Sequence, residues 1–370
     1  MKILFVSHSY PPTLGGVEIQ NFNLAKGLGQ IAEVRVIANG KGKKHLPVFL
    51  PLTFFKILFL MPKYDACLMG NGVLAPLGAA ARIFHPKKKF FCVIHGLDIT
   101  FASKKGLLSR IYSAVNIPSL KFVDKLFMVG NATIEEAVKI GIERNHCIFI
   151  PNGIDAKKLR KPHDRTELSK LFGSDIQGKQ VILRLARFVK HKGTSWFIEN
   201  VMPKLPDSVV MIAAGHRVGK NTAGDKDNFS VCEDIIKEKH LENRVKLMPS
   251  LPQKDMETLL NTVDICVSPN IEVPGTMEGF GINVIEAGGC ERVVIASDLE
   301  GLKDAIKDGK NGFLVEPENA EAWTEKINEI LGKDDAFRKE FGKKAAAYVE
   351  ENFNWEKISK RYLEEMTKMQ

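Results

Sequence analysis

Residues 1–28 read Met-Lys-Ile-Leu-Phe-Val-Ser-His-Ser-Tyr-Pro-Pro-Thr-Leu-Gly-Gly-Val-Glu-Ile-Gln-Asn-Phe-Asn-Leu-Ala-Lys-Gly-Leu. Within the strand predicted at 2–7, the apolar residues at 3–6 are continuous rather than alternating, which is typical of a strand in a parallel sheet buried on both faces. A glycine pair and a helical pattern over 18–28 follow it. The stretch therefore predicts one strand–helix unit, the building block of a doubly wound sheet.

The same unit recurs along the whole chain. In the first half, strands are predicted at residues 2–7, 33–38, 64–69, 89–95, 125–129 and 147–150. In the second half, they are predicted at 181–185, 209–214, 245–248, 265–268, 293–296 and 313–315. Helical segments lie between them, so each half predicts a Rossmann-like, doubly wound parallel sheet of the α/β class. A length of 370 residues suits two such domains.

This pattern predicts an N-terminal domain at 1–155, a C-terminal domain at 156–352 and a final helical segment at 353–370. The polar stretch at 154–177 is interpreted as a linker with one short helix. Residues 219–228 are polar and contain glycine, which favours a mobile loop.

Charge is distributed unevenly between the halves. The net charge is +9, and residues 1–150 hold 19 Lys and Arg against 8 Asp and Glu, whereas residues 151–370 hold 34 against 36. A basic half favours an anionic partner, either a membrane surface or nucleic acid, although a solvated surface without a partner stays open. None of the six cysteines forms a Cys-x-x-Cys pair, so we expect reduced cysteines in a cytoplasmic protein and no zinc site.

The most apolar segment, residues 46–61, falls short of the ~20 residues of a spanning helix and is interrupted by prolines and Lys56. Lysines flank it or lie further along the basic half, at Lys41, Lys43, Lys44, Lys87, Lys88, Lys89, Lys104 and Lys105. An apolar stretch flanked by lysines predicts peripheral docking on the cytoplasmic face of an anionic membrane. The alternative is that its phenylalanines, Phe49, Phe54, Phe55 and Phe59, pack in the core.

Candidate binding residues follow the strands, because ligands of such sheets bind at the carboxyl ends of the strands. Gly15 and Gly16 open a helix whose free N–H groups suit a phosphate, although Gly-Gly before a helix is common. His95 follows the strand at 89–95, where a structural role is the alternative. Arg187 and Lys192 follow the strand at 181–185, and two cations suit a leaving diphosphate as well as they suit a solvated loop.

The most informative motif is Glu278-Gly279-Phe280-Gly281-Ile282-Asn283-Val284-Ile285-Glu286. Two carboxylates flank a Gly-Phe-Gly turn that opens a helix. The turn offers N–H groups to sugar hydroxyls or phosphate, Glu278 suits a donor sugar, and Glu286 suits two ribose hydroxyls. A capping glutamate and a surface glutamate are the alternative, which the apolar neighbours of Glu286 disfavour.

These residues resemble those of glycosyltransferase family four, also called group 1, of the GT-B fold. The family's motifs are matched, in order, by Pro-x-x-Gly-Gly at 12–16, His-Gly-x-Asp at 95–98, Pro-Asn-Gly-Ile-Asp at 151–155, Arg187 with Lys192, and Glu278 with Glu286. The resemblance spans nearly the whole chain. Two positions depart from it: Ala186 stands where the family has glycine, and its Gly-x-Gly after the next strand reads Gly215-His216-Arg217.

The resemblance implies two Rossmann-like domains facing a cleft, with the acceptor bound by 1–155, the nucleotide sugar by 156–352, and the last helix crossing back. It implies a retaining, metal-independent hexosyltransferase without a cofactor, using a UDP-, GDP- or ADP-sugar and a lipid-linked or cell-envelope glycan acceptor. Its implied catalytic residues are Arg187, Lys192, Glu278 and His95. Its implied nucleotide-sugar ligands are Gly15, Gly16, Asn152, Gly279, Phe280, Gly281, Ile282 and Glu286.

Three other functions compete with a transferase. The first is a nicotinamide-dependent reductase, because Gly-x-Gly-x-x-Ala at 70–75 resembles a dinucleotide-binding fingerprint, but the acidic residue expected about 20 positions later is missing. A nucleotide-sugar epimerase can share the fold. A non-catalytic protein that binds nucleic acid or another anionic surface would explain the basic half, but no nucleic-acid-binding signature is present.

Overall fold

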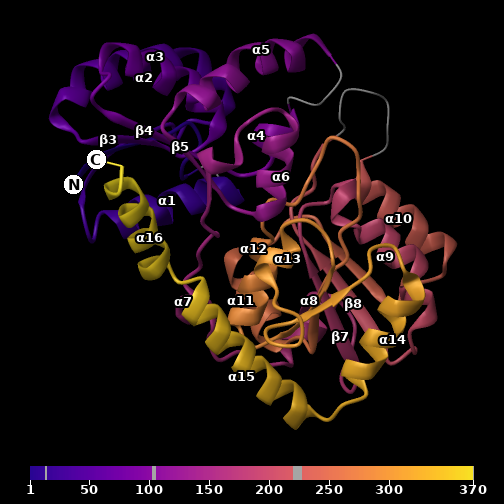
Figure 1. Ribbon diagram of the computed structural model, residues 1–370. Coiled ribbons are helices and arrows are strands. Elements are labelled where there is room, and N and C mark those ends of the chain that lie inside the picture. The colour runs from indigo at the N-terminus through magenta and orange to yellow at the C-terminus, as the bar shows by residue number, and fades with distance from the viewer. Residues whose placement is uncertain (13–14, 102–105, 220–226, 370) are drawn as a thin grey trace. The chain divides into compact units, whose positions relative to one another are not determined.

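The computed structural model describes residues 1–12, 15–101, 106–219 and 227–369. The chain forms two compact units (Figure 1): unit 1 holds residues 1–153, 275–280 and 353–370, and unit 2 holds 154–274 and 281–352. Some residues of the predicted motifs lie outside the described residues, namely Thr13, Leu14, Lys104, Lys105 and 220–226 of the expected loop, as does the side chain of Lys43.

Unit 1 contains a six-stranded parallel sheet. Its strands are β1 (Lys2–Ser7), β2 (Glu33–Ala38), β3 (Ala66–Met69), β4 (Lys89–Ile94), β5 (Lys125–Met128) and β6 (Cys147–Phe149). They lie in the order β2-β1-β3-β4-β5-β6, so the connections change direction between β1 and β3. Ligands of such sheets bind where the strand order reverses, at the carboxyl ends of the strands.

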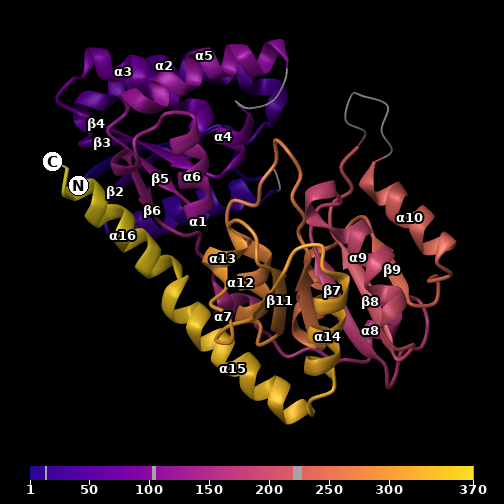
Figure 2. The same cartoon turned by 45° about the vertical axis from the view of Figure 1, so that its right-hand side comes forward.

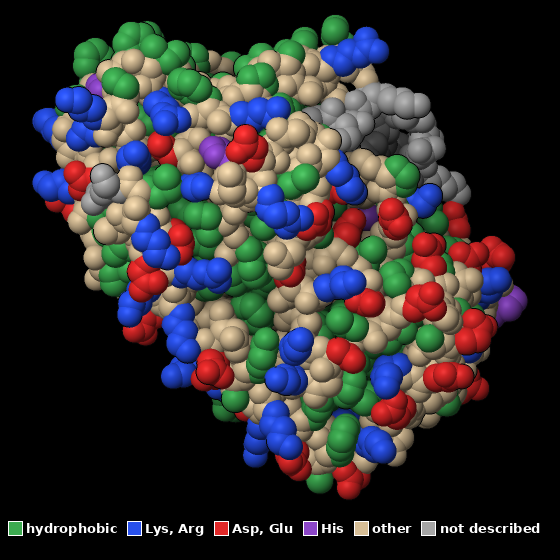
Figure 3. All heavy atoms as spheres, in the orientation of Figure 1, with side chains coloured by type: hydrophobic (Ala, Val, Ile, Leu, Met, Phe, Trp, Pro, Cys, Tyr) green, Lys and Arg blue, Asp and Glu red, His purple; other side chains and the backbone are tan. Residues whose placement is uncertain are grey.

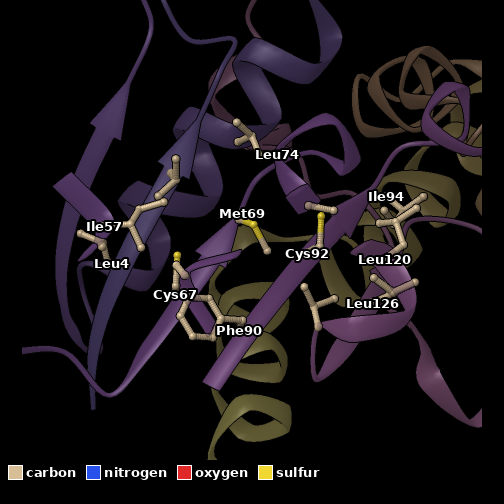
Figure 4. Packing of buried hydrophobic residues seen from close by; sticks show 14 of the residues in the cluster. Leu4, Ile57, Cys67, Met69, Leu74, Phe90, Cys92, Ile94, Leu120 and Leu126 are labelled. Atoms are coloured by element: carbon tan, nitrogen blue, oxygen red, sulfur yellow. The ribbon is translucent and has the colours of Figure 1, made fainter. Parts of the chain in front are cut away.

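Helices cover this sheet. They are α1 (Gly16–Leu28), α2 (Leu46–Leu60), α3 (Ala75–Phe84), α4 (Leu97–Thr100), α5 (Leu107–Phe122), α6 (Asn131–Lys139) and α16 (Trp355–Thr367). Side chains from the strands and from α2 and α5 form one apolar core, in which Ile57, Met69, Phe90 and Leu120 are fully buried (Figure 4).

The C-terminal helix α16 packs within unit 1 because small residues let it approach α1. A Cβ atom on Gly27 of α1 would lie 2.1 Å from the hydroxyl oxygen of Ser359 in α16. Tyr362 of α16 meets Phe127 of β5 edge to face, with ring centroids 4.9 Å apart. The last helix therefore covers the sheet formed by the start of the chain.

Unit 2 repeats the architecture. Its strands are β7 (Gln180–Leu185), β8 (Val209–Ala214), β9 (Val245–Met248), β10 (Ile265–Ser268), β11 (Val293–Ser297) and β12 (Phe313–Val315). They are parallel and lie in the order β12-β11-β10-β7-β8-β9, several of them visible in Figure 2. The strand order reverses between β7 and β10, which places the expected ligand position at the carboxyl ends of these two strands.

The helices of unit 2 are α7 (Ala156–Leu159), α8 (Glu167–Phe172), α9 (Thr194–Asn200), α10 (Asn228–Glu238), α11 (Gln253–Thr262), α12 (Ile282–Gly289), α13 (Leu302–Ala305), α14 (Ala320–Leu331) and α15 (Asp335–Asn352). One apolar core joins the sheet to α9, α10 and α14, with Phe197 and Trp323 fully buried in it. Every strand predicted from the sequence is present, with ends shifted by at most two residues.

The stretch expected to be a linker differs from the prediction. It contains two short helices rather than one, and it packs on unit 2, where α8 lies against α11. Arg165 pairs with Asp264 at 2.7 Å and also donates to the carbonyl of Thr262. The polar residues of this stretch therefore form surface ion pairs and hydrogen bonds within unit 2, and the stretch is not a free linker.

The apolar segment is helix α2, and it is only partly buried. Phe49 and Ile57 are buried in the core, whereas Phe55 and Phe59 are exposed, Phe59 to 78%. Among the described residues, Leu46–Lys63 is the one helical stretch that by length and composition could cross a membrane, with a mean hydropathy of 1.5. Core packing thus accounts for one face of α2 and leaves the other apolar face uncovered.

Candidate active site

The Arg-Lys pair lies at the point where the strand order of unit 2 reverses. Arg187 is exposed just after β7, and Lys192 is partly exposed at the end of a 3₁₀ turn, Lys190–Lys192. Gly193 follows in the left-handed region, with φ 69°. The structure therefore brings both predicted cations to the carboxyl end of β7.

The loops after β7 and β10 pack tightly against each other. A Cβ atom on Gly193 would lie 1.7 Å from the carbonyl oxygen of Pro269, a distance that no side chain tolerates. The backbone N–H of Ile271 donates to the carbonyl of His191 at 3.0 Å. The turn that carries Lys192 is thus supported by the loop of the neighbouring strand.

The two departures from the family pattern lie together. Gly215, with φ 151°, would place a Cβ atom 1.9 Å from the carbonyl oxygen of Ala186. Arg217 turns to α10, where its guanidinium bonds Asp227 at 2.8 Å and lies over the ring of Phe229. That hydrogen bond lowers the pKa of Asp227 to about 2. Arg217 is therefore bound within unit 2 by a protein carboxylate.

Glu286 lies on α12, which begins at Ile282 after Gly281 in the left-handed region, φ 86°. Its side chain is partly buried among apolar neighbours, and burial raises the pKa of the carboxyl to about 7. Hydrogen bonds from two hydroxyl groups would favour the ionised form of such a carboxylate. The geometry suits a polar ligand that arrives with paired hydroxyls.

His95 follows β4 in unit 1, and its imidazole is tied to the neighbouring strand. Its Nε2 lies 3.0 Å from the carbonyl oxygen of Gly70, after β3, so Nε2 carries the proton in that contact. Its backbone N–H donates to Asp98 at 2.9 Å. Burial lowers the pKa of His95, which favours a neutral ring with Nδ1 as an acceptor.

The segment 275–280 packs onto this turn within unit 1. A Cβ atom on Gly279 would lie 2.3 Å from the carbonyl oxygen of His95, and one on Gly96 would lie 3.1 Å from Met277. Phe280 is buried and meets Phe353 edge to face. Glu278, which is partly exposed, directly precedes Gly279, the residue that packs against the His95 carbonyl.

The glycine pair precedes α1, and a carboxylate lies beside it. Gly15 is extended, and Glu18 in the first turn accepts a hydrogen bond from the hydroxyl of Ser9. A Cβ atom on Gly15 would meet the Glu18 carboxylate at 2.3 Å. The negative charge of Glu18 also acts on His95. Glu18 and Ser9 are therefore neighbours of the predicted site that the sequence motifs do not include.

Asn152 is buried in unit 1. With His95, Asn21 and Tyr362 it lines a small cavity. The predicted residues thus form two groups. One is in unit 1, with Gly15, Gly16, His95, Asn152, Glu278, Gly279 and Phe280, and one is in unit 2, with Arg187, Lys192, Gly281, Ile282 and Glu286.

Metal-ligating side chains do not gather anywhere in the described part of the chain. Across those residues, no group of three or more His, Cys, Asp and Glu side chains could hold a metal ion.

Known proteins resemble this chain in sequence and in fold. Residues 169–348 match the family model described as Glycosyl transferases group 1. The N,N'-diacetylbacillosaminyl-diphospho-undecaprenol alpha-1,3-N-acetylgalactosaminyltransferase of Campylobacter jejuni is 27% identical over 282 residues, 74% of this chain and 69% of that protein. The N-acetyl-alpha-D-glucosaminyl L-malate synthase of Bacillus anthracis is 22% identical over 379 residues, 95% of this chain and 93% of that protein.

The fold matches that of Anabaena HepE in complex with UDP-glucose, with a TM-score of 0.77 and 20% identity over the full length of both chains. Neither the Campylobacter nor the Bacillus relative is named as an epimerase or a non-catalytic binding protein, so the relatives do not favour those alternatives. With two parallel six-stranded sheets and these relatives, the chain is a glycosyltransferase of the GT-B fold, related through its second half to the group 1 glycosyl transferases.

Proposed function

We propose that this glycosyltransferase is a retaining, metal-independent hexosyltransferase that acts on a lipid-linked acceptor at an anionic membrane. The observation that carries the proposal is the placement of Arg187 and Lys192 at the strand-order reversal of unit 2. Breaking the bond between sugar and diphosphate leaves negative charge on the phosphate oxygens. Two fixed cations stabilise that charge in the transition state, which is the task that a metal ion performs in other enzymes.

Glu286 and Glu278 recognise different parts of the nucleotide-sugar donor. Glu286 suits the ribose, because two hydroxyl donors would stabilise its charge in a site that otherwise raises its pKa to about 7. Glu278 binds the donor sugar. The residue after it, Gly279, packs against the His95 carbonyl, so His95 is a close neighbour of this part of the site. UDP-sugars are the first donors to test, because the HepE structure holds UDP-glucose.

Retention of configuration rests on the family resemblance and on the names of two relatives. Both names describe alpha-configured products, and an alpha product from an alpha-configured sugar nucleotide keeps the configuration. In the proposed reaction the acceptor oxygen attacks the anomeric carbon on the face from which the diphosphate leaves. The leaving phosphate oxygen takes the acceptor proton, and Arg187 and Lys192 hold that phosphate in place.

The acceptor is proposed to be a sugar on a polyprenyl diphosphate, as named for the Campylobacter relative. The supporting surface consists of helices α2, α3 and α5, which we call the apolar ridge. Its exposed side chains are Val48, Leu52, Phe55, Phe59, Ile83, Phe84, Leu107, Ile111, Val115 and Phe122. Hydrophobic side chains gather over these helices in Figure 3.

Charge on the apolar ridge suits an anionic membrane. The sequences of α2, α3 and α5 contain no Asp or Glu, and they carry Lys56, Arg82, Arg110 and Lys121. Not every cation of the basic half is available, since Arg82 pairs with Asp124 at 3.1 Å and Lys88 donates to the carbonyl of Tyr64 at 2.6 Å. Exposed apolar patches of this kind mark interaction sites, and each cation near an anionic surface contributes ~1 kcal/mol.

Two experiments test the proposed function. A thermal-shift panel of UDP-, GDP- and ADP-sugars identifies the nucleotide, since a ligand at 100 times its Kd adds about 2.7 kcal/mol of stability. Transfer of radiolabelled sugar is then compared for a polyprenyl-diphospho-sugar and for L-malate, the acceptors in the names of the Campylobacter and Bacillus relatives. Label in the butanol-extractable lipid, with the donor's anomeric configuration by NMR, supports the proposal. Label only on a soluble acceptor, or an inverted product, overturns it.

A further inference from the structure

One charged side chain is embedded in the central strand of unit 2. Arg184 lies in β7 within the run Gln-Val-Ile-Leu-Arg-Leu and is 1% exposed. Burying a guanidinium is unfavourable unless hydrogen bonds compensate the lost water. Its neighbours in the strand, Leu183 and Leu185, are apolar, so strand formation alone does not explain a charged residue at this position.

The guanidinium joins the two loops where the strand order reverses. One terminal nitrogen donates to the hydroxyl of Ser268 at the end of β10, at 3.0 Å. The other donates to the side-chain oxygen of Asn270 at 3.0 Å and to the backbone carbonyl of Lys192 at 2.6 Å. Arg184 therefore holds the residue proposed to meet the leaving diphosphate.

A second layer of hydrogen bonds connects this cluster to α12 and β11. The Asn283 amide on α12 donates to Ser268 at 3.3 Å, and Ser297 of β11 donates to the carbonyl of Asn270 at 2.6 Å. Ser268 and Asn270, the partners of Arg184, are therefore fixed by further hydrogen bonds, and such a network favours a single arrangement of its side chains. The same cluster that orients Lys192 also contacts the helix that carries Glu286.

We propose that Arg184 is a positioning residue for the leaving-group site, acting through the backbone of Lys192. This inference rests on the proposed role of Lys192. Without the guanidinium, the Lys190–Lys192 turn loses the bond to the Lys192 carbonyl and the ammonium group shifts from the diphosphate. A displacement of about 1 Å by a residue away from the chemistry can lower the rate about 10²-fold.

The test is a double-mutant cycle between Arg184→Met and Lys192→Ala. Methionine is an unbranched apolar side chain that removes the charge but leaves the Ser268, Asn270 and Lys192 acceptors without this donor, so thermal unfolding is recorded for every variant. Arg184→Lys is the conservative variant, because one ammonium cannot reach all three acceptors in the planar geometry of a guanidinium. Turnover is measured as release of nucleoside diphosphate from the sugar nucleotide that the panel selects. Binding of UDP, GDP and ADP is measured by calorimetry.

Arg244→Met is the matched control. Arg244 belongs to the same unit, and its guanidinium also bonds backbone carbonyls, those of Leu205 and Val209, but it lies beside the start of β8 rather than at the strand-order reversal. Its loss should lower the melting temperature and leave kcat within about twofold of the wild type. This control separates general weakening of unit 2 from a specific effect on Lys192.

Arg184→Met and Arg184→Lys are expected to lower kcat about 10- to 100-fold, with the acceptor KM unchanged. In the double mutant, Arg184→Met should add less than threefold to the loss of Lys192→Ala, since Arg184 acts through Lys192. Multiplicative losses, normal kcat in both Arg184 variants, or unfolding of both at 25 °C would overturn the inference. Normal turnover of Lys192→Ala would overturn the proposed function itself, a separate result.

Discussion

Gly279 packs against the carbonyl oxygen of His95 so closely that a Cβ atom on residue 279 would lie 2.3 Å from that oxygen. Both partners are backbone groups, so no flexible side chain can move aside. The contact explains why glycine is needed directly after Glu278, the residue proposed to bind the donor sugar. It also ties Glu278 to the turn that follows β4.

This contact predicts that Gly279→Ala lowers turnover at least tenfold and destabilises the protein by about 1–3 kcal/mol, because the loop must shift. The measurements are steady-state kinetics and thermal unfolding. Gly219→Ala is the control, since a Cβ atom there meets none of the described residues within 4 Å. Equal behaviour of the two variants would contradict the structural role of Gly279.

Arg187→Ala and Lys192→Ala are each expected to lower turnover by about 10²–10³ while the protein stays folded, because each removes a charge from the leaving group. Lys190→Ala tests general electrostatics, since Lys190 is exposed on the same turn as Lys192. Its kcat should stay within about twofold of the wild type. Near-normal turnover of either main variant at saturating donor would remove that residue from the mechanism.

Activity is expected to survive dialysis against EDTA, because Arg187 and Lys192 are proposed to supply the positive charge that a metal would otherwise provide. The measurement compares transfer rates of dialysed enzyme with and without added Mg²⁺ or Mn²⁺. Loss of activity in EDTA with rescue by either ion would refute metal independence.

The raised pKa of Glu286 predicts how the stability of the protein and its affinity for the nucleotide change with pH. Its pKa is about 7 in the folded protein and 4.5 ordinarily, so the folded state holds the proton more tightly than the unfolded chain. Its contribution to stability is therefore present below pH 4.5 and is lost as the pH rises through 7. Affinity for the nucleotide should increase about tenfold from pH 6 to pH 8, as the carboxylate ionises.

Glu286→Gln should flatten both pH dependences and weaken the free nucleoside diphosphate. Glu278→Gln should mainly weaken the sugar-bearing donor, and calorimetry with both ligands distinguishes the two effects. Equal losses for both ligands in both variants would rule out this division of recognition.

The apolar ridge predicts binding to anionic vesicles. Phe55→Ser with Phe59→Ser should lower partitioning onto phosphatidylglycerol vesicles at least tenfold, since burying a phenylalanine contributes about 1.5–3 kcal/mol. Ile31→Ser is the control, an exposed apolar residue outside the ridge. Co-sedimentation at low and high salt measures both the apolar and the electrostatic contribution. No binding at low salt, together with full activity on a soluble acceptor, would remove the membrane from the proposed function.

The sequence alone determined the positions of the strands, to within two residues, and the order of the motifs. The continuous apolar run at 3–6 is typical of a strand in a sheet covered on both sides, and β1 is buried from Ile3 to Ser7. Likewise, Arg187 and Lys192 follow a predicted strand, which places them at its carboxyl end whatever the packing elsewhere. These features depend on local periodicity and chain direction, and both can be seen in a single sequence.

Only the tertiary structure decided the contacts between residues far apart in the chain. Gly279 meets His95 across more than 180 positions, and Arg184 reaches Ser268 and Asn270 because β10 lies beside β7. The tertiary packing also buries Phe49 and leaves Phe59 exposed on the same helix. Burial of Glu286 raises its pKa to about 7. Exposure and desolvation depend on which surfaces the fold brings together, and no local pattern of residues contains that information.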